Sequence, residues 1–212
     1  EILAGEDEPT PANTAISLPT EDLRQDPQDW RNWSIIPEYI SGRAREIYQK
    51  GIMIGNDPHA FSVTGDCQAI REVMLGEFDD PRKYTLKSDE LYLQEAIDQF
   101  QGSFNRNGAA VRGGFTAASV LSPIHADPKE CKSGETPLGC EFRLHNPSIL
   151  IISLEVWNDR ANLDRYELYL RQIIEYSIEE GVLPVLMTKA DMAEALQHVI
   201  NPTLVQLAYE YD

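Results

Sequence analysis

Residues 60–67 read Ala-Phe-Ser-Val-Thr-Gly-Asp-Cys, a short apolar run that ends in Gly-Asp-Cys. The run predicts a β-strand, and a direct turn from Gly65-Asp66 into a helix would place Cys67 at the helix N-terminus. Unpaired backbone N–H groups and the helix dipole favour negative charge at that position. We therefore expect the Cys67 thiol to ionise more readily than a free thiol and to have the chemistry of a nucleophile.

Strand patterns alternate with helix patterns along the rest of the chain. Residues 148–154 are almost continuously apolar, as is typical of a strand buried on both faces of a parallel sheet. Shorter strands are expected at 109–111 and 182–187, where Pro184 indicates an edge or a strand end. Helices are expected at 37–51, 66–75, 89–101, 116–121, 162–180 and 191–211, the last with a break at Pro202. This order predicts a mainly parallel α/β sheet in a three-layer α/β/α sandwich of flavodoxin-like type.

The charge balance excludes two classes of partner. The chain has 212 residues, enough for one domain with a full core, and a net charge of −17. Such a surface repels phosphate groups, so we expect no nucleic-acid binding and little affinity for anionic lipid. A purely solubilising role for the charge is the simplest interpretation. No stretch approaches the ~20 apolar residues of a membrane-spanning helix.

The first 34 residues differ from the remainder of the chain. They are acidic, carry four prolines and show no clear hydrophobic period, which predicts an extended arm or linker before a domain at 35–212. The chain begins with Glu1, as a mature protein would after removal of a signal or lipoprotein leader. A domain cut at an arbitrary position would look the same.

Two of the three cysteines bracket a short polar loop. Cys131 and Cys140 enclose eight residues rich in turn formers, and we expect them to form a disulfide. Because such bonds persist in oxidising compartments, the pair favours an extracellular or cell-surface location. The alternative is two unpaired thiols in a cytosolic protein. No second cysteine pair or closely spaced histidine pair accompanies them, so we expect neither a metal site nor a cofactor.

The motifs at successive strand ends resemble those of the SGNH (GDSL-type) hydrolase superfamily. They are Gly65-Asp66-Cys67, a glycine-rich turn with Thr116, and an apolar strand followed by Asn158-Asp159. The resemblance covers residues 35–212 and implies a three-layer α/β/α fold that hydrolyses esters, often acyl groups on sugars or lipids. In that family a serine follows Gly-Asp, and a glycine N–H and an asparagine complete the oxyanion hole. A late Asp-x-x-His block supplies the general base.

Carried over residue by residue, the resemblance puts Cys67 at the nucleophile position. Ala117 or Gly114 would supply the oxyanion N–H, and Asn158 the oxyanion side chain, although a loop or capping asparagine is the alternative. No Asp-x-x-His block is present. His125 is the histidine whose loop could fold over the strand ends, whereas His59, His145 and His198 lie in other contexts. If the chain ends at Asp212, the sheet also lacks the family's last strand.

Two functions follow as hypotheses. The leading one is an exported SGNH-like domain whose catalytic site is degenerate or incomplete and which acts as a surface, binding or assembly module. The alternative is an esterase or acyl hydrolase of carbohydrate or lipid esters, with Cys67 as nucleophile and the base missing from this chain. The expected partners are a carbohydrate or acyl ester, and further copies of the chain. Residues 14–18 of the arm would join the copies into an oligomer or filament by adding a strand to the sheet edge.

Overall fold

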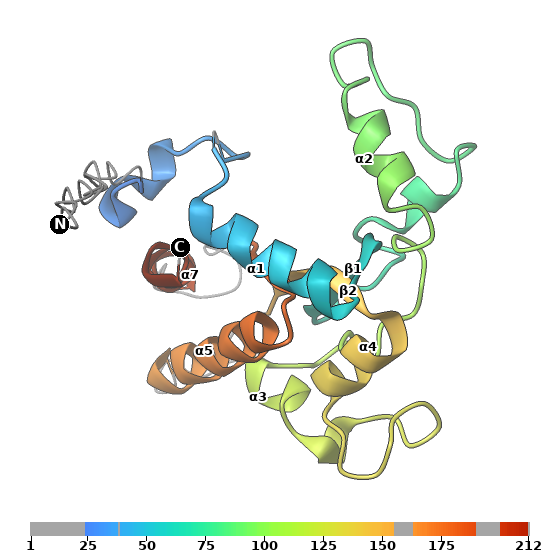
Figure 1. Cartoon of the computed structure of the whole chain (residues 1–212), viewed down its shortest axis with the longest axis vertical. Helices are drawn as coiled ribbons and strands as arrows, with labels where there is room; N and C mark the ends of the chain where they lie inside the picture. The colour runs from blue at the N-terminus through green and yellow to red at the C-terminus, as the bar shows by residue number, and fades with distance from the viewer. Residues whose placement is uncertain (1–23, 38, 155–162, 190–199, 212) are drawn as a thin grey trace, which may run out of the picture.

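The computed structural model describes residues 24–37, 39–154, 163–189 and 200–211 (Figure 1). Its centre is a parallel sheet of three strands, β1 (Asp57–Gly65), β2 (Pro147–Ser153) and β3 (Leu183–Leu186), in the order β1-β2-β3. In the register, Gly65 lies beside Ser153 and Ile152 lies beside Leu186. The chain is therefore of the mixed α/β class with a parallel sheet, as the sequence predicts.

The main hydrophobic core covers one face of the sheet. Leu150 and Ile152 of β2 are fully buried there, whereas Ile149 and Ile151, on the opposite face, are only partly buried. Helices α3 (Ala117–Val120), α4 (Pro137–His145), α5 (Leu163–Glu179) and α7 (Ile200–Tyr211) contribute side chains to this core. Helix α1 (Gly42–Ile54) packs against β2 and β3, and its buried Ile47 lies outside that cluster.

A close approach between two glycines fixes how α1 meets the turn before β3. A Cβ atom on Gly51 would lie 2.0 Å from the carbonyl oxygen of Gly181. Gly181 follows α5 with a positive φ of +66°, so it reverses the chain where the sequence predicts the helix to stop. The Asn56 side chain donates a hydrogen bond of 3.1 Å to the same carbonyl. A larger residue at either glycine would push α1 away from the sheet.

The helix expected at 66–75 is not formed. These residues make a series of turns, in which Ala69 N–H donates to Asp66 O and Gly76 N–H donates to Arg71 O. The Asp66 side chain accepts from Gln68 N–H, a local bond that competes with a regular helix. The dipole that we expected to act on Cys67 is therefore absent. The strand expected at 109–111 is reduced to one parallel bridge between Val111 and Gly65.

Other boundaries shift for local reasons. Helix α1 begins at Gly42 because the Ser41 hydroxyl accepts from Ala44 N–H. Helix α4 was not predicted; it begins inside the expected cysteine loop, at Pro137 after the capping residue Thr136, and extends beyond Cys140. Pro202 lies in the first turn of α7 and does not break it, and residues 191–199 of the expected helix lie outside the described residues. The remaining elements are α2 (Leu93–Gln99), which with its neighbouring loops stands away from the sheet, and the 3-10 helices η1 (Pro27–Asn32), η2 (Gly76–Asp79) and η3 (Pro123–His125) (Figure 1).

The described part of the expected arm contacts the body of the domain. Helix η1 packs against α7, and the Arg24 guanidinium lies 4.4 Å from the ring centroid of Tyr209. Arg24 also donates to the Tyr209 carbonyl oxygen at 3.3 Å, which satisfies an acceptor in the last turn of α7. The two ends of the described chain thus lie together. Residues 14–18, which we expected to pair with the sheet edge, lie outside the described residues.

The disulfide between Cys131 and Cys140 is confirmed. The two Cα atoms lie 5.3 Å apart, and Cys140 sits fully buried within α4. Cys67 is the remaining cysteine; it is free and exposed. The disulfide therefore fastens the polar loop to a helix that belongs to the core.

Removal of this crosslink should destabilise the domain. We expect the Cys131→Ser/Cys140→Ser variant to lose roughly 2–3 kcal/mol of unfolding free energy, the chain-entropy effect of a ten-residue loop. Urea unfolding followed by circular dichroism measures the loss. The exposed Cys67→Ser variant is the control and should unfold at the wild-type urea concentration. Equal midpoints for all three proteins would contradict the expectation.

Candidate functional site

The carboxyl ends of the strands meet at one edge of the sheet, where Gly65, Ser153 and Leu186 end β1, β2 and β3. After β1 the chain passes through Val111, which pairs with Gly65 on one side of β1. It later forms β2, which pairs with β1 on the other side. In α/β sheets this change of direction opens a crevice at the carboxyl ends, and ligands bind there. The candidate site therefore lies beyond Gly65.

Asp66 and Cys67 follow β1 directly into this region. Asp66 is fully buried, whereas the Cys67 side chain is exposed. A Cβ atom on Gly113 would lie 3.8 Å from Cys67 Cβ, so the backbone of the glycine-rich turn adjoins the cysteine. The structure thus brings the first two sequence motifs side by side.

The predicted oxyanion residues occupy three different settings. Gly114 is exposed and has a φ of +85°, at the turn beside Cys67. The side chain of Ala117 is buried in the core at the start of α3. Asn158 lies outside the described residues. Gly113, which sequence reasoning did not select, is the glycine in contact range of Cys67, and the oxyanion roles remain predictions.

A buried ion pair lies behind the cysteine. Lys189, which follows β3, places its Nζ atom 3.6 Å from Asp66 Oδ2, and the two side chains are 3% and 0% exposed. Neither atom has a hydrogen-bond partner among the described residues. Asn201 of α7 holds the Lys189 backbone by accepting from its N–H at 2.8 Å and donating to its carbonyl at 2.9 Å. The sequence places Lys189 at this edge, but its pairing with Asp66 was not predicted.

The described histidines lie in different parts of the fold, rather than together at one catalytic site. His59 lies near the start of β1, at the opposite end of the strand from Cys67, and its ring contacts the Gln99 carbonyl. His145 is the last residue of α4. The ring of His125 lies 6.2 Å from that of Phe115, just after the glycine-rich turn. His125 thus contacts the residue that follows the glycine-rich turn, and His198 lies outside the described residues.

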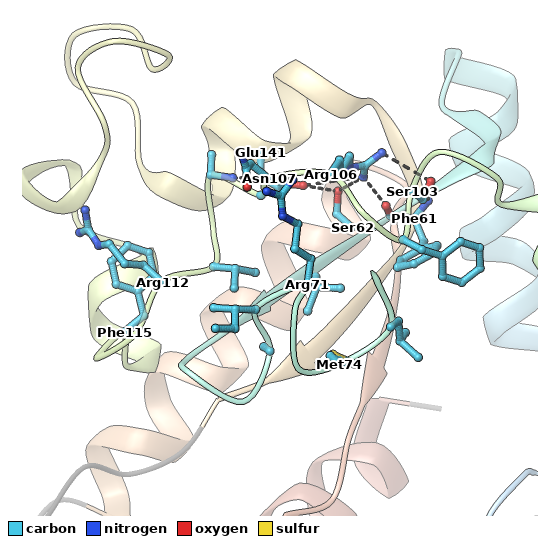
Figure 2. A pocket seen from close by; sticks show the side chains of 18 of the residues that line it. Phe61, Ser62, Arg71, Met74, Ser103, Arg106, Asn107, Arg112, Phe115 and Glu141 are labelled. Carbon is cyan, nitrogen blue, oxygen red and sulfur yellow. Dashed lines mark hydrogen bonds and ion pairs between the residues drawn. The ribbon is translucent and has the colours of Figure 1, made fainter. Parts of the chain in front are cut away.

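A pocket of about 300 Å³ opens between the 69–75 turns and the 103–112 loop (Figure 2). Figure 2 shows Glu141, Asn107, Arg106 and Ser62 along one side of it and Met74 on the opposite side, with the Arg71 side chain between them. Nothing in the sequence pattern indicated this pocket, because its walls come from segments without regular structure.

Glu141 organises the polar side of the pocket. This carboxylate is 1% exposed; it accepts from the Ser62 hydroxyl at 2.6 Å and from Ala109 N–H at 2.6 Å. Arg106 Nη2 lies 3.7 Å from one carboxylate oxygen, and His145 Nε2 lies 3.8 Å from the other. Each carboxylate oxygen thus accepts one hydrogen bond and has one basic side chain nearby, and such partners offset the cost of burying a carboxylate.

Burial governs the ionisation of the groups beside Glu141. Desolvation lowers the pKa of His145, although the Glu141 charge opposes the effect. Desolvation likewise lowers the pKa of Arg106, with Glu141 again opposing it. A lowered pKa favours the neutral form of the His145 ring.

Comparisons with family models, curated proteins and solved structures find no match to this chain. Among the described residues, no helix is long and apolar enough to cross a membrane. The one group of close metal-ligating side chains found there is Cys131, Glu135 and Cys140. Its sulfur atoms form the disulfide, and Arg143 binds the Glu135 carboxylate at 2.7 Å, so the group offers no thiolate ligand.

The ion pair behind Cys67 should show strong coupling in unfolding experiments. Lys189→Met leaves the Asp66 charge buried and unpaired, so we expect a loss of roughly 3–5 kcal/mol. Asp66→Asn/Lys189→Met removes both charges and should be more stable than the single Lys189 variant. Urea unfolding of the four proteins of this double-mutant cycle measures the coupling. Losses that simply add would show that the two charges do not interact.

Proposed function

We propose that this chain is an exported SGNH-like binding module whose carboxyl edge holds a ligand without catalysing its hydrolysis. The observation that carries the proposal is the setting of Cys67. Its thiol is exposed, and no hydrogen bond from the thiol to a basic side chain is found among the described residues. A nucleophile in acyl transfer is normally activated by an adjacent base or a positively charged neighbour.

The residue before the cysteine supports the same proposal. Asp66 is held by Lys189 and by Gln68 N–H, so its carboxylate is directed into the protein interior. A group fixed in that way stabilises the turn but is unavailable to orient a histidine. Among the described residues, no set of proton-transfer groups is assembled around Cys67, which supports binding without hydrolysis.

Export rests on the disulfide. The Cys131–Cys140 bond is of the kind that persists in oxidising compartments and is rare in the cytosol. The net charge of −17 opposes self-association, as suits a protein that remains dissolved outside a cell.

Assembly through a strand added to the sheet receives less support. Met187 N–H donates to Ile152 O, so the backbone groups of Met187 point toward β2. Because this orientation alternates along a strand, the backbone groups of Pro184 and Leu186 in β3 point away from β2, toward the open edge of the described sheet. Proline has no N–H to donate, and an edge with proline resists strand addition. Within the described residues, β3 thus offers a poor template to the arm of another copy.

An acyl hydrolase is the second candidate. The closeness of the Gly113 backbone to Cys67 favours a hydrolase, because backbone N–H groups beside a nucleophile can form an oxyanion hole. A cysteine thiol is also intrinsically nucleophilic without full activation. In this case His125, whose ring contacts Phe115 after the glycine-rich turn, would be the candidate base.

Ester turnover separates the two candidates. With p-nitrophenyl acetate, the Cys67 thiolate would attack the carbonyl carbon, expel p-nitrophenolate and form a thioester. We expect release of at most about one equivalent of p-nitrophenol and then none, because the described residues supply no base that would activate water for deacylation. Absorbance of p-nitrophenol against time provides the measurement, with Cys67→Ala as the matched control. Sustained release that the control lacks would establish the hydrolase instead.

A further inference from the structure

A second pocket opens at the edge of the sheet opposite Cys67. Asn56 precedes β1, Pro147 begins β2 and Val182 precedes β3, so the pocket that they line lies at the amino ends of the strands. Helices α4 and α5 contribute further lining residues. The volume of about 690 Å³ is within the range of small-molecule sites.

The disulfide holds one wall of this pocket in place. Glu135, Thr136 and Gly139 line the pocket, and all three lie between Cys131 and Cys140. Because the crosslink fastens this segment to α4, the wall is ordered before a ligand arrives. Such preorganisation lowers the entropic cost of binding.

The pocket carries an unpaired carboxylate. Its charged lining residues are Glu135, Arg143 and Glu180. Arg143 donates to both carboxylate oxygens of Glu135, at 2.7 Å and 2.8 Å, so these two charges offset each other. The exposed Glu180 carboxylate makes no hydrogen bond or ion pair with the described residues. The lining is therefore net negative, and the chain's net charge of −17 also favours the approach of a cation.

The ring of Tyr176 responds to these carboxylates. Burial raises the pKa of Tyr176, and the charges of Glu180 and Glu135 raise it further. The phenol oxygen makes no hydrogen bond with the described residues, so it is able to accept one from a ligand. The negative charge of Glu180 thus acts on the interior of the pocket and not on its rim alone.

Amide oxygens add further acceptors. Asn56 Nδ2 donates to the carbonyl oxygens of Glu180 and Gly181, at 2.9 Å and 3.1 Å, and Asn146 Nδ2 donates to the Gly55 carbonyl. Both side chains line the pocket, and with their nitrogens committed, their Oδ1 atoms have no donor among the described residues. A ligand that brings several N–H donors would fit these acceptors.

The pocket also offers apolar surface. The rings of Phe142 and Tyr176 stack with centroids 5.5 Å apart and planes 12° apart, and Leu121 and Val182 line the same pocket. Such surface suits the methylene groups of a chain that ends in a charged head. A guanidinium presents more N–H donors than an ammonium and holds them in one plane, so it matches several acceptors at once.

We propose that the pocket at the amino ends of the strands binds a guanidinium group on an aliphatic stem, as found in agmatine or in an arginine side chain. The inference goes beyond the proposed function, because this pocket and the carboxyl edge lie at opposite ends of the strands. A failure of either proposal leaves the other in place.

Titration of the nitrogen-15-labelled protein with N-acetyl-L-arginine methylamide tests the proposal, since backbone amide NMR shifts report both affinity and location. We expect saturation with a Kd of roughly 1 mM, typical of a ligand of this size. The largest shifts should occur at Gly139 and Val182 rather than at Gly65. The citrulline analogue, which has the same shape without the charge, should bind about tenfold more weakly because charge-assisted hydrogen bonds are lost.

A matched pair of variants separates this pocket from the general acidity of the chain. Glu180→Gln should weaken binding of the arginine ligand about tenfold and leave binding of the citrulline ligand unchanged. Glu179→Gln is the control, because Glu179 is equally exposed, lies outside the pocket lining and changes the net charge by the same amount. Its affinity should equal that of the wild type. Tyr176→Phe, which keeps the stacked ring, should weaken binding several-fold.

Three results would overturn the proposal. Equal affinities for the arginine and citrulline ligands would show that the charge is not recognised. Equal losses in Glu179→Gln and Glu180→Gln, or shifts centred on Gly65, would place the cation elsewhere on the chain. Binding of N-acetyl-L-lysine methylamide as tight as that of the arginine ligand would remove the preference for a guanidinium. A comparison with agmatine then assigns the source: tighter binding of agmatine supports a free small cation, and tighter binding of the blocked arginine supports a peptide side chain.

Discussion

Parallel pairing of β1 with β2 is the constraint on which the remaining structure depends. Parallel strands cannot be joined by a hairpin, so the chain between them must return across the sheet to the starting edge. Residues 66–146 make that return, and they carry the glycine-rich turn, the disulfide loop and α4. Pairing also aligns Gly65 with Ser153, which brings the ends of both strands to one edge. The candidate site is a consequence of this alignment.

Two buried carboxylates hold the irregular segments around that sheet. Glu141 links β1 to the 103–109 loop through Ser62 and Ala109, and Asp66 links the end of β1 to the chain after β3 through Lys189. Segments without regular hydrogen bonding need such anchors, because their backbone groups must otherwise be left unsatisfied or solvated. These internal acids therefore fix local geometry, separately from the acidic groups on the surface.

The sequence predicted features that depend on short-range pattern. The apolar run of β2, the short helix capped by Thr116 and the Cys131–Cys140 bond follow from neighbouring residues alone. The helix expected after Gly65 was wrong because the Asp66 side chain bonds Gln68 N–H and turns inward. Helix α4 was missed because Pro137 and Gly139 indicate a turn, although proline also suits a first helical turn. The pairing of Lys189 with Asp66 and the pocket beneath Arg71 depend on contacts between distant segments, for which a single sequence has no local signal.

The contact between Cys67 and the glycine-rich turn tests this account most directly. A Cβ atom at position 113 would lie 3.8 Å from Cys67 Cβ, within the ~3.5–4.5 Å that joins disulfide-bonded residues. Gly113→Cys should therefore crosslink to Cys67 under mild oxidation and leave no free thiol in the denatured protein. Gly114→Cys is the control, since a Cβ there meets no atom within 4 Å. Two free thiols in the oxidised Gly113→Cys protein would contradict the arrangement of the carboxyl edge.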